Sequence, residues 1–423
     1  MYKRQPLHKE GGAPGVIELA HQQGVKIMAS IGGWSMCKHF PEMAADPIKR
    51  ARFIEDCKKL IAVGFDGIDL DWEYPGPYAG MNFTGSEADF ANFATLVQEI
   101  RNAIGPDKLI TAAMAADPRK LEGHDWSSLS NTMDYFNMMT YDYNGGWSNK
   151  AGHNAPVYAY SDAEVPFFSW ESTLDKLTEM GVPKNKICMG APFYGRGVIT
   201  NGQADLNAPT VKKQVTLQPD GPISTSADYT NWPLDVYDGT PNYFFIKQKA
   251  LAPNSGWTRK WDDEAKVPYL VKDNFFLSYD DEESIEIKAQ FIKDEGLAGT
   301  IIWTVFGDLE FSGSATSYGN KLKKWSNVKS PLVNKINEVF AGGGSLGVDD
   351  LASLNISVFP NPSNDIVTIS TEVKNVTVFD MTGKKVLTTN QNIFNIAPLS
   401  QGMYLLQVTL PGDRKAVTKL SRM

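Results

Sequence analysis

The chain is poor in cysteine and histidine, and it contains no long apolar run. The three cysteines among its 423 residues, Cys37, Cys57 and Cys188, are scattered and odd in number, so they predict neither a disulfide framework nor a zinc site. The five histidines never stand at the spacing of metal ligands, and we expect neither a metal nor a cofactor. No segment approaches the roughly 18 apolar residues of a membrane-spanning helix. The first fifteen residues also lack the apolar stretch of a secretory signal peptide.

A basic excess is absent as well. The chain has 41 Lys and Arg against 49 Asp and Glu, a net charge of −8, which argues against a nucleic-acid-binding protein. Residues 351–423 carry 7 basic and 4 acidic residues and no tryptophan, whereas the first 350 residues carry 34 basic and 45 acidic ones. The glycine-rich segment 341–350 separates the two parts and is typical of a linker. We therefore expect one domain in residues 1–340 and a second in residues 351–423.

The first domain shows an alternation of short apolar runs with longer amphipathic segments. The apolar runs indicate strands at 25–33, 67–74, 108–116, 133–142, 186–195 and 299–308. The amphipathic segments indicate helices at 46–64, 86–105, 170–181, 281–296 and 321–340, the last interrupted near Pro331. This repeat predicts a parallel α/β sheet, either open or closed as a (β/α) barrel, although six strands are found and a barrel needs eight.

Two other regions depart from this repeat. Residues 197–279 interrupt it, and we expect an inserted α+β module there, because a structureless loop of that length would be unusual. Residues 351–423 contain short alternating segments separated by Asn-Pro, Thr-Gly and Gln-Gly turns. That pattern predicts an all-β sandwich.

The segment DGIDLDWEY, residues 66–74, carries the sharpest chemical signal. Side chains alternate between the faces of a strand, so Asp69, Asp71 and Glu73 point to one side and their apolar neighbours to the other. Like charges crowded on a buried face resist ionising together, which favours a carboxyl that keeps its proton and can act as a general acid. The alternative reading is a calcium site or a solvated acidic edge.

This segment resembles the catalytic-strand signature of glycoside hydrolase family 18, the chitinases. Four further motifs stand in the order of that family: SIGGW at 30–34, MMTYD at 138–142, GAPFYGRG at 190–197 and WTVFGD at 303–308. The resemblance implies a (β/α)8 TIM barrel with an α+β insertion before its last strand. Because SIGGW normally lies on the third strand, it also implies that about the first two βα units and the signal peptide are missing. We therefore expect this sequence by itself to have little activity.

The resemblance also implies the roles of the acidic residues. Glu73 would protonate the glycosidic oxygen and later activate water, while the N-acetyl oxygen of the substrate attacks the anomeric carbon, with retention. Asp71 would orient the acetamido N–H, and Asp69 would exchange a proton with Asp71. Tyr141 would bind the acetamido carbonyl, and Asp142 would help to hold the distorted sugar.

The same resemblance places further residues near substrate, and some of them have a purely structural alternative. Trp303 would form the apolar floor beneath the sugar. Met139 could serve packing as well as substrate contact. Trp34 and Trp147 could occupy core positions as well as line outer sugar subsites. Tyr194 and Arg196 are expected to face the cleft. The glycines of SIGGW are as compatible with tight strand packing as with function.

The C-terminal domain resembles the sorting domain that directs cargo through the type IX secretion system of Bacteroidetes, on VFPNPSND, MTGKKV and GMYLLQV. The resemblance implies an extracellular protein with that machinery as partner; the alternative is a carbohydrate-binding or fibronectin-like sandwich. For the first domain we expect a chitinase acting on chitin or chitooligosaccharides. An endo-β-N-acetylglucosaminidase on glycoproteins and a non-catalytic chitin-binding lectin are the alternatives.

Overall fold

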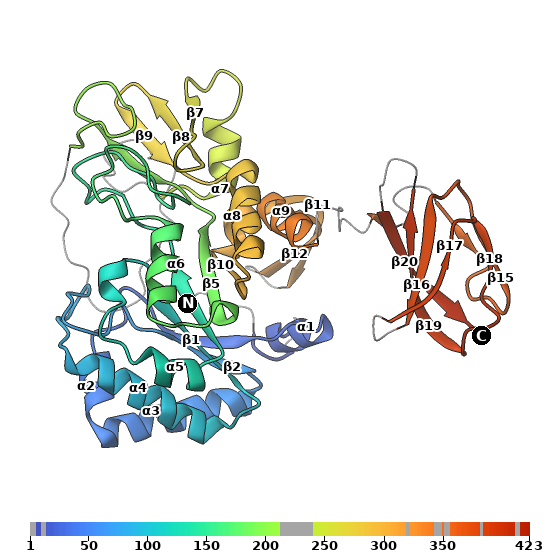
Figure 1. The fold of residues 1–423 in the computed structure, drawn as a ribbon, viewed down its shortest axis with the longest axis horizontal. Coiled ribbons are helices and arrows are strands. Elements are labelled where there is room, and N and C mark those ends of the chain that lie inside the picture. The colour runs from blue at the N-terminus through green and yellow to red at the C-terminus, as the bar shows by residue number, and fades with distance from the viewer. Residues whose placement is uncertain are drawn as a thin grey trace. The chain divides into compact units, whose positions relative to one another are not determined.

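The computed structural model of the chain describes residues 6–9, 14–211, 240–318, 322–341, 349–350, 356–380, 384–410 and 415–423. The chain divides into two compact units, Met1–Leu332 and Val333–Met423 (Figure 1). In the described part, no helix has the length and apolar character that crossing a membrane requires.

The first unit is built on a parallel sheet of six strands, as the alternation of strands and helices predicts. The sheet order is β1-β2-β3-β4-β5-β10, and every neighbouring pair is parallel. The strands are β1 (Met28–Gly32), β2 (Gly67–Asp71), β3 (Leu109–Ala115), β4 (Tyr135–Met139), β5 (Ile187–Pro192) and β10 (Gly299–Trp303). They amount to six of the eight strands of a closed barrel, and in the described part β1 and β10 form the sheet edges.

Helices connect these strands and pack on the outside of the sheet (Figure 1). They are α1 (Val16–Gln22), α2 (Phe40–Ala45), α3 (Pro47–Val63), α4 (Ala88–Ile104), α5 (Trp126–Thr132), α6 (Trp170–Glu179) and α8 (Glu282–Asp294). The Asp46 side chain caps α3, and Asp281 and Ser284 form a capping box on α8, so both helices begin where the sequence pattern places them. The short helices α1, α2 and α5 carry too few turns to stand out in the sequence.

The outward face of β2 lies in the core beneath these helices. Ile68, Leu70 and Trp72 are at most 1% exposed. The Trp72 ring packs between Phe40 of α2 and Phe93 of α4, with ring centroids 5.4 and 6.2 Å away. The alternation along β2 is thus as expected, and the acidic residues between these apolar ones face the interior of the sheet's curve.

An α+β insertion precedes the last strand of the sheet, as expected. It contains an antiparallel sheet of β6 (Arg196–Ile199), β9 (Phe275–Ser278), β8 (Val267–Lys272) and β7 (Thr258–Asp262), in that order, with helix α7 (Tyr243–Phe245) and the π-helical turn η4 (Ile246–Ala250). Residues 212–239 of the predicted module lie outside the described residues. A buried ion pair joins Lys288 of α8 to Asp280 next to β9, with Nζ 2.6 and 2.7 Å from the two carboxylate oxygens.

The prediction of a helix over 321–340 is wrong in its first half. Residues Leu322–Lys329 form β12, which pairs with β11 (Glu310–Tyr318) in an antiparallel hairpin. The helix α9 covers only Pro331–Phe340 and begins where the Asp308 carboxylate accepts hydrogen bonds from the Ser330 hydroxyl and the Leu332 N–H. The hairpin depends on a non-local pairing partner, which the local apolar spacing does not reveal.

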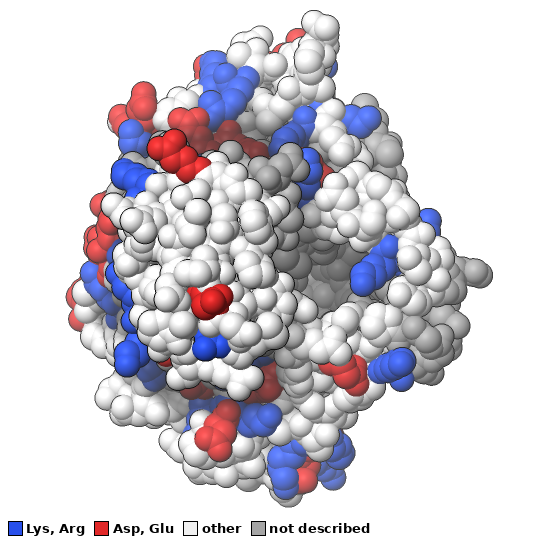
Figure 2. Space-filling model, turned by 90° about the vertical axis from the view of Figure 1, so that its right-hand side faces the viewer, with Lys and Arg blue, Asp and Glu red and all other residues white. Residues whose placement is uncertain are grey.

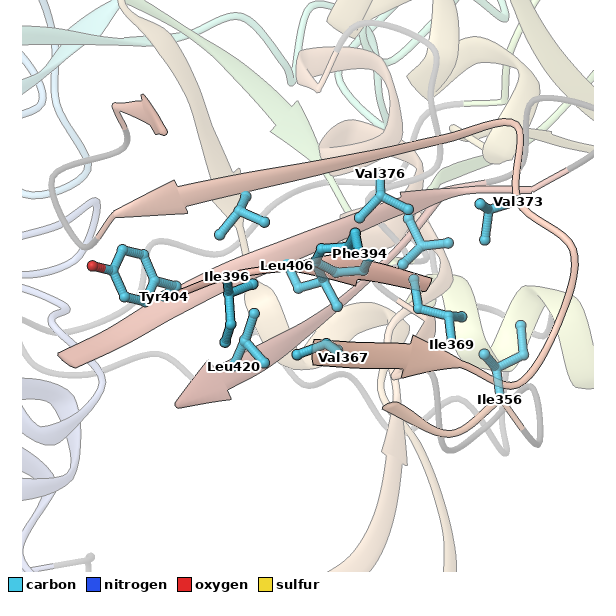
Figure 3. Close-up of a cluster of buried hydrophobic side chains, with 12 residues drawn as sticks. Ile356, Val367, Ile369, Val373, Val376, Phe394, Ile396, Tyr404, Leu406 and Leu420 are labelled. Carbon is cyan, nitrogen blue, oxygen red and sulfur yellow. The ribbon is translucent and has the colours of Figure 1, made fainter. Parts of the chain in front are cut away.

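After α9, the second unit is an all-β sandwich, as predicted. One sheet has the order β13-β20-β19-β16-β17 and the other β14-β15-β18. The strands are β13 (Asp349–Asp350), β14 (Val358–Phe359), β15 (Ile366–Ile369), β16 (Asn375–Asp380), β17 (Lys385–Thr389), β18 (Ile393–Asn395), β19 (Gly402–Thr409) and β20 (Lys415–Arg422). Twelve buried side chains, mostly aliphatic, fill the space between the sheets (Figure 3).

Charged side chains of both signs are interspersed on the face shown in Figure 2.

Candidate active site

The candidate site lies at the carboxyl end of β2, where barrel enzymes place their chemistry. Asp69 and Asp71 belong to β2, and Glu73 follows two residues after its end. The structure brings the three carboxyl groups together: the charge of Asp69 acts on Asp71, and that of Asp71 on Glu73.

Asp69 is held by donors from three neighbouring strands. Its carboxylate accepts hydrogen bonds from the Ser30 hydroxyl of β1 at 2.6 Å, the Thr111 hydroxyl of β3 at 2.5 Å and the Asn137 amide of β4 at 3.2 Å. An ionised carboxylate only accepts hydrogen bonds, so three converging donors suit the charged form of Asp69.

Asp71 has the opposite environment. Its buried Oδ1 atom has no hydrogen-bond partner in the described part of the chain. Burial, and then the charge of Asp69, raise the pKa of the Asp71 carboxyl above its usual range. The two aspartates of one strand thus differ in environment, and the surroundings of Asp71 favour its protonated form.

The pKa of Glu73 is also raised, chiefly by burial and then by the charges of Asp71 and Asp142. A hydrogen bond from the Tyr74 hydroxyl and the charge of Lys120 oppose this shift. A carboxyl that keeps its proton near neutral pH and lies at the mouth of a barrel suits a general acid.

Backbone contacts fix the approach of β1 to this carboxyl row. A side chain at Gly32, whose φ is 118°, would bring its Cβ within 2.2 Å of the Asp71 carbonyl oxygen. The Cys37 thiol donates to the carbonyls of Gly33 and Asp71 at 3.1 and 3.0 Å and accepts from the Glu73 N–H at 3.3 Å. Gly32 therefore serves close strand packing, the structural alternative given for the SIGGW glycines.

A second cluster surrounds Asp142, three residues beyond Met139, the last residue of β4. The Asp142 carboxylate accepts from the Tyr194 hydroxyl at 2.6 Å and from Arg196 Nε and Nη2 at 2.7 and 2.6 Å. The Arg196 guanidinium lies 5.1 Å from the centroid of the Trp147 ring. These four residues, which we name the Asp142 cluster (Asp142, Trp147, Tyr194 and Arg196), are in direct contact.

Tyr141 lies between this cluster and the carboxyl row. Its ring centroid is 6.2 Å from that of Tyr194, and the charges of Asp142, Asp71 and Glu73 all act on its hydroxyl. A Cβ at Gly190 of β5 would lie 2.6 Å from the Tyr141 ring, so the glycine of the GAPFYGRG motif provides the space for this tyrosine.

The three tryptophans expected near the substrate are exposed, and two of them lie outside the Asp142 cluster. Trp303 at the end of β10, Trp34 after β1 and Trp147 each expose 46% of their surface. Within the described ranges, no ring contact joins Trp34 or Trp303 to the Asp142 cluster. Met139 is partly buried at the end of β4.

The sequence analysis missed several residues that hold this site. Thr111 and Asn137 bind Asp69, and the Asn154 side chain accepts a 2.9 Å hydrogen bond from the Asp142 N–H, whose residue has a φ of 58°. Thr111 and Asn137 are isolated polar residues inside apolar strands, a signal that could have identified them. Nothing in the local sequence distinguishes Asn154 or Cys37.

The described residues contain no group of three or more His, Cys, Asp or Glu side chains arranged to hold a metal ion. Within the carboxyl row, Asp69 accepts hydrogen bonds from protein side chains, whereas Asp71 Oδ1 accepts none in the described structure.

Comparison with known families agrees with this geometry. Residues 14–308, more than half of the chain, match the model of Glycosyl hydrolases family 18, and the chain belongs to this family. Residues 357–421 match the model of the Secretion system C-terminal sorting domain. Both family resemblances drawn from the sequence are thereby confirmed, and a sorting domain of this kind implies a secreted or cell-surface protein.

Individual relatives carry names of related enzymes. The chain is 34% identical over 308 residues to a probable endochitinase of Caenorhabditis elegans, covering 70% of this chain and 46% of that protein. It resembles the structure of chitinase ChiA74 from Bacillus thuringiensis with a TM-score of 0.65 and 28% identity, covering 97% of this chain and 68% of the other. A family 18 N-acetylglucosaminidase from Paenibacillus barengoltzii gives a TM-score of 0.60 and 29% identity, covering 69% and 81%. The chain spans between 41% and 66% of the length of four curated relatives.

Proposed function

We propose that the first unit carries the catalytic groups for the hydrolysis of β-1,4-linked N-acetylglucosamine polymers, chitin or chitooligosaccharides, with Glu73 as general acid and base. The observation that carries this proposal is the unequal row of carboxyl groups on β2. Asp69 is saturated with donors, whereas Asp71 and Glu73 have raised pKa values. The names of the family 18 relatives support the substrate class.

The proposed reaction is the substrate-assisted one that the resemblance to family 18 implies. Glu73 gives its proton to the glycosidic oxygen while the carbonyl oxygen of the substrate's N-acetyl group attacks the anomeric carbon, and the leaving sugar departs with the electron pair of the broken bond. The Glu73 carboxylate then removes a proton from water, which opens the cyclic intermediate. The configuration is retained because the anomeric carbon is inverted twice.

The residues around Glu73 hold the N-acetyl group in this scheme. The unpartnered oxygen of Asp71 accepts a hydrogen bond from the acetamido N–H, and Asp69 exchanges a proton with Asp71. The Tyr141 hydroxyl donates a hydrogen bond to the acetamido oxygen. Asp142, fixed by Tyr194 and Arg196, helps to hold the distorted sugar, and the exposed ring of Trp303 supports its apolar face.

The test is the variant Glu73→Gln, which keeps the side-chain volume and removes the proton that is transferred. We expect turnover of chitooligosaccharides to fall by about 10²–10⁴-fold, the usual contribution of a general acid, while their binding in calorimetry persists. Glu55→Gln is the matched control, because Glu55 is 60% exposed on α3. An unchanged rate in Glu73→Gln would refute the role of Glu73.

The alternative activities are separated by products and by binding. An endo-β-N-acetylglucosaminidase would use the same residues, but the insertion whose strand β6 starts at Arg196 favours a deep groove for a linear polymer. Release of intact oligosaccharide from a high-mannose glycoprotein, without cleavage of chitin, would identify that enzyme. Binding of chitin without cleavage of either substrate would identify a lectin.

We further propose that residues 351–423 form a domain that addresses the protein to the type IX secretion machinery, joined by the linker 341–350 to the catalytic domain 1–340. The carbohydrate-binding alternative is weakened by Tyr404, the domain's single tyrosine. It is 7% exposed, and its hydroxyl donates to the Ser400 carbonyl at 2.6 Å, so it offers no platform for a sugar.

Deletion of residues 351–423 tests the sorting proposal in a bacterium that carries this secretion system. We expect the shortened protein to stay inside the cell and the full chain to reach the surface or the medium. Binding of chitooligosaccharide by the shortened protein in the lysate is the control for folding. Equal export of both proteins would contradict the proposal.

A further inference from the structure

A lysine ammonium group lies beside the carboxyl row without an ion-pair partner. Lys120 ends the 3₁₀ turn η1 (Pro118–Lys120) after β3, and its Nζ atom is 4.2 Å from the centroid of the Tyr74 ring and 5.6 Å from that of Tyr78. The neighbouring Arg119 forms an ion pair with Asp117, in which Nη2 lies 2.7 Å from Oδ2. In the part of the chain that the structure describes, Lys120 has no such carboxylate contact.

The surroundings of Lys120 are mostly apolar. It borders a small cavity together with Trp72, Tyr74, Phe93 and His124. Trp72 Nε1 and His124 Nδ1 are buried without a hydrogen-bond partner in the described structure. Because a partly buried charge in such surroundings is unfavourable unless another group compensates it, simple packing does not explain a lysine here.

The compensating groups are the Tyr74 ring and the site carboxyl behind it. A cation is attracted to the face of an aromatic ring, and this attraction grows when water is excluded. Tyr74 directly follows Glu73 in the chain, and its hydroxyl and the positive charge of Lys120 both lower the pKa of Glu73. Lys120, Tyr74 and Glu73 therefore form a connected series.

We propose that Lys120 is a positioning residue, whose ammonium group holds the Tyr74 ring in place and stabilises the carboxylate that Glu73 becomes when it gives up its proton. This inference rests on the proposed role of Glu73 as general acid. In the first step the proton moves from Glu73 to the glycosidic oxygen, whose bond to the anomeric carbon breaks. Lys120 keeps all its own protons throughout.

The groups around Glu73 show why a cation is needed there. Asp71 on its own strand and Asp142 after β4 both disfavour a charge on Glu73. The Cys37 thiol after β1 and the Tyr141 hydroxyl after β4 face it as neutral groups. Among the groups that act on Glu73, Lys120 is the cation, so it offsets the two carboxylates at the moment when Glu73 becomes ionised.

The experiment is a titration of the Glu73 carboxyl by infrared spectroscopy, with Glu73→Gln subtracted to identify its band. We expect Lys120→Met to move this titration upwards by up to about one pH unit, because an opposite charge that acts on the carboxyl is lost. Lys120→Arg keeps the charge and should restore the wild-type titration. Arg119→Gln is the matched control, since it removes an exposed charge from the same turn and should leave the titration unchanged.

Turnover gives a second, independent readout. With chitooligosaccharide, Lys120→Met should lower kcat by up to about tenfold, the equivalent of one pH unit, and move the alkaline limb of the pH profile upwards, with KM nearly unchanged. A loss of turnover that is equal at every pH, with an unmoved Glu73 titration, would overturn the proposal. Lys120→Gln repeats the charge removal with a polar side chain, so a folding defect in the methionine variant does not decide the result.

The outcomes separate this inference from the proposed function. If the Glu73 titration shifts in Lys120→Met but no variant and no wild-type chain cleaves a chitooligosaccharide or a glycoprotein, Lys120 acts on Glu73 as proposed and the hydrolase proposal is wrong. If wild-type turnover depends on Glu73 but Lys120→Arg is as impaired as Lys120→Met, charge is not what Lys120 supplies.

Discussion

Replacing Asp69 by asparagine should separate its charge from its role in packing. Asp69 Oδ1 accepts from Thr111 and Asn137, and Oδ2 accepts from the Ser30 hydroxyl. An asparagine can keep its oxygen towards Thr111 and Asn137 and donate from its amide to Ser30, because a hydroxyl also accepts. Asp69→Asn therefore removes the charge and preserves the network, whereas Asp69→Ala removes both.

The two variants differ in the expected loss of stability. In Asp69→Ala, the buried Thr111 hydroxyl and the partly buried Asn137 amide lose their acceptor, at roughly 1–3 kcal/mol for each group that stays unsatisfied. In Asp69→Asn these bonds become neutral ones and the loss should stay near about 1 kcal/mol. Ser30 is exposed and can turn to water in either variant.

The charge itself is expected to show in the pH dependence of stability. The raised pKa of Asp71 means that the folded chain binds a proton more tightly than the unfolded chain does. The resulting stabilisation is complete below the unfolded pKa of about 4 and is lost as pH rises through the raised folded pKa. Removing the Asp69 charge lowers the pKa of Asp71, and each unit of that decrease reduces the loss by about 1.4 kcal/mol.

Differential scanning calorimetry between pH 4 and the raised folded pKa measures both effects on the transition of the first unit. Asp69→Asn should show a flatter decline of Tm with rising pH than the wild type, and Asp69→Ala should be lower at every pH. Glu73 keeps its own raised pKa in all three proteins, so some decline remains. The reasoning is refuted if Asp69→Asn declines as steeply as the wild type.

Three further predictions concern other parts of the first unit. Lys288→Met should destabilise it by about 3–5 kcal/mol in calorimetry, because Asp280 is left buried and unpaired, and adding Asp280→Leu should recover part of the loss. Arg196→Met should lower kcat/KM about 10–100-fold by releasing the Asp142 carboxylate, and Arg196→Lys should rescue little, since lysine cannot make the paired contact; full rescue would contradict this. Burial raises the thiol pKa to about 12 for Cys37, about 12 for Cys57 and about 11 for Cys188. Mass spectrometry should therefore find little alkylation of these cysteines at pH 8 in the folded protein and complete alkylation after denaturation.

The acidic row could be predicted from sequence because its cause is local. Alternation along a strand places Asp69, Asp71 and Glu73 on one face whatever surrounds them. The apolar residues between them identify which face is covered, and their near-complete burial agrees. The starts of α3 and α8 were predictable for the same reason, since a capping side chain acts within three residues.

The partners of that row could not be predicted, because they depend on register between strands. Thr111 meets Asp69 through the β2–β3 register, which pairs these two residues directly. Asn137 reaches Asp69 from β4, a strand further along the sheet. Register follows from packing of whole strands, and an isolated polar residue within an apolar strand shows only that some partner exists.

The insertion contributes to the candidate site, and its role also escapes local reasoning. Its first strand, β6, begins at Arg196, whose guanidinium holds Asp142 from 54 positions along the chain. Ser278 of β9 pairs with Arg196 in that sheet and accepts from the Asn154 N–H at 2.8 Å, while Asn154 binds the backbone of Asp142. A change in the β6–β9 pairing would therefore move Asp142, so the insertion supports the candidate site.

Asp69 and Asp71 differ in their hydrogen-bond partners, and this difference bears on which group of a substrate the site can bind. Two carboxyl groups on one strand would be equivalent in water, but three donors bind Asp69 and none reaches Asp71 Oδ1 within the described structure. A buried acceptor without a partner is unfavourable, and an amide N–H of a bound ligand would relieve that cost. A hydroxyl of plain glucose could also donate to Asp71, but glucose has no acetamido oxygen to attack the anomeric carbon. The unsatisfied oxygen of Asp71 therefore suits the acetamido group of the proposed substrate, and the proposed reaction is what requires that group.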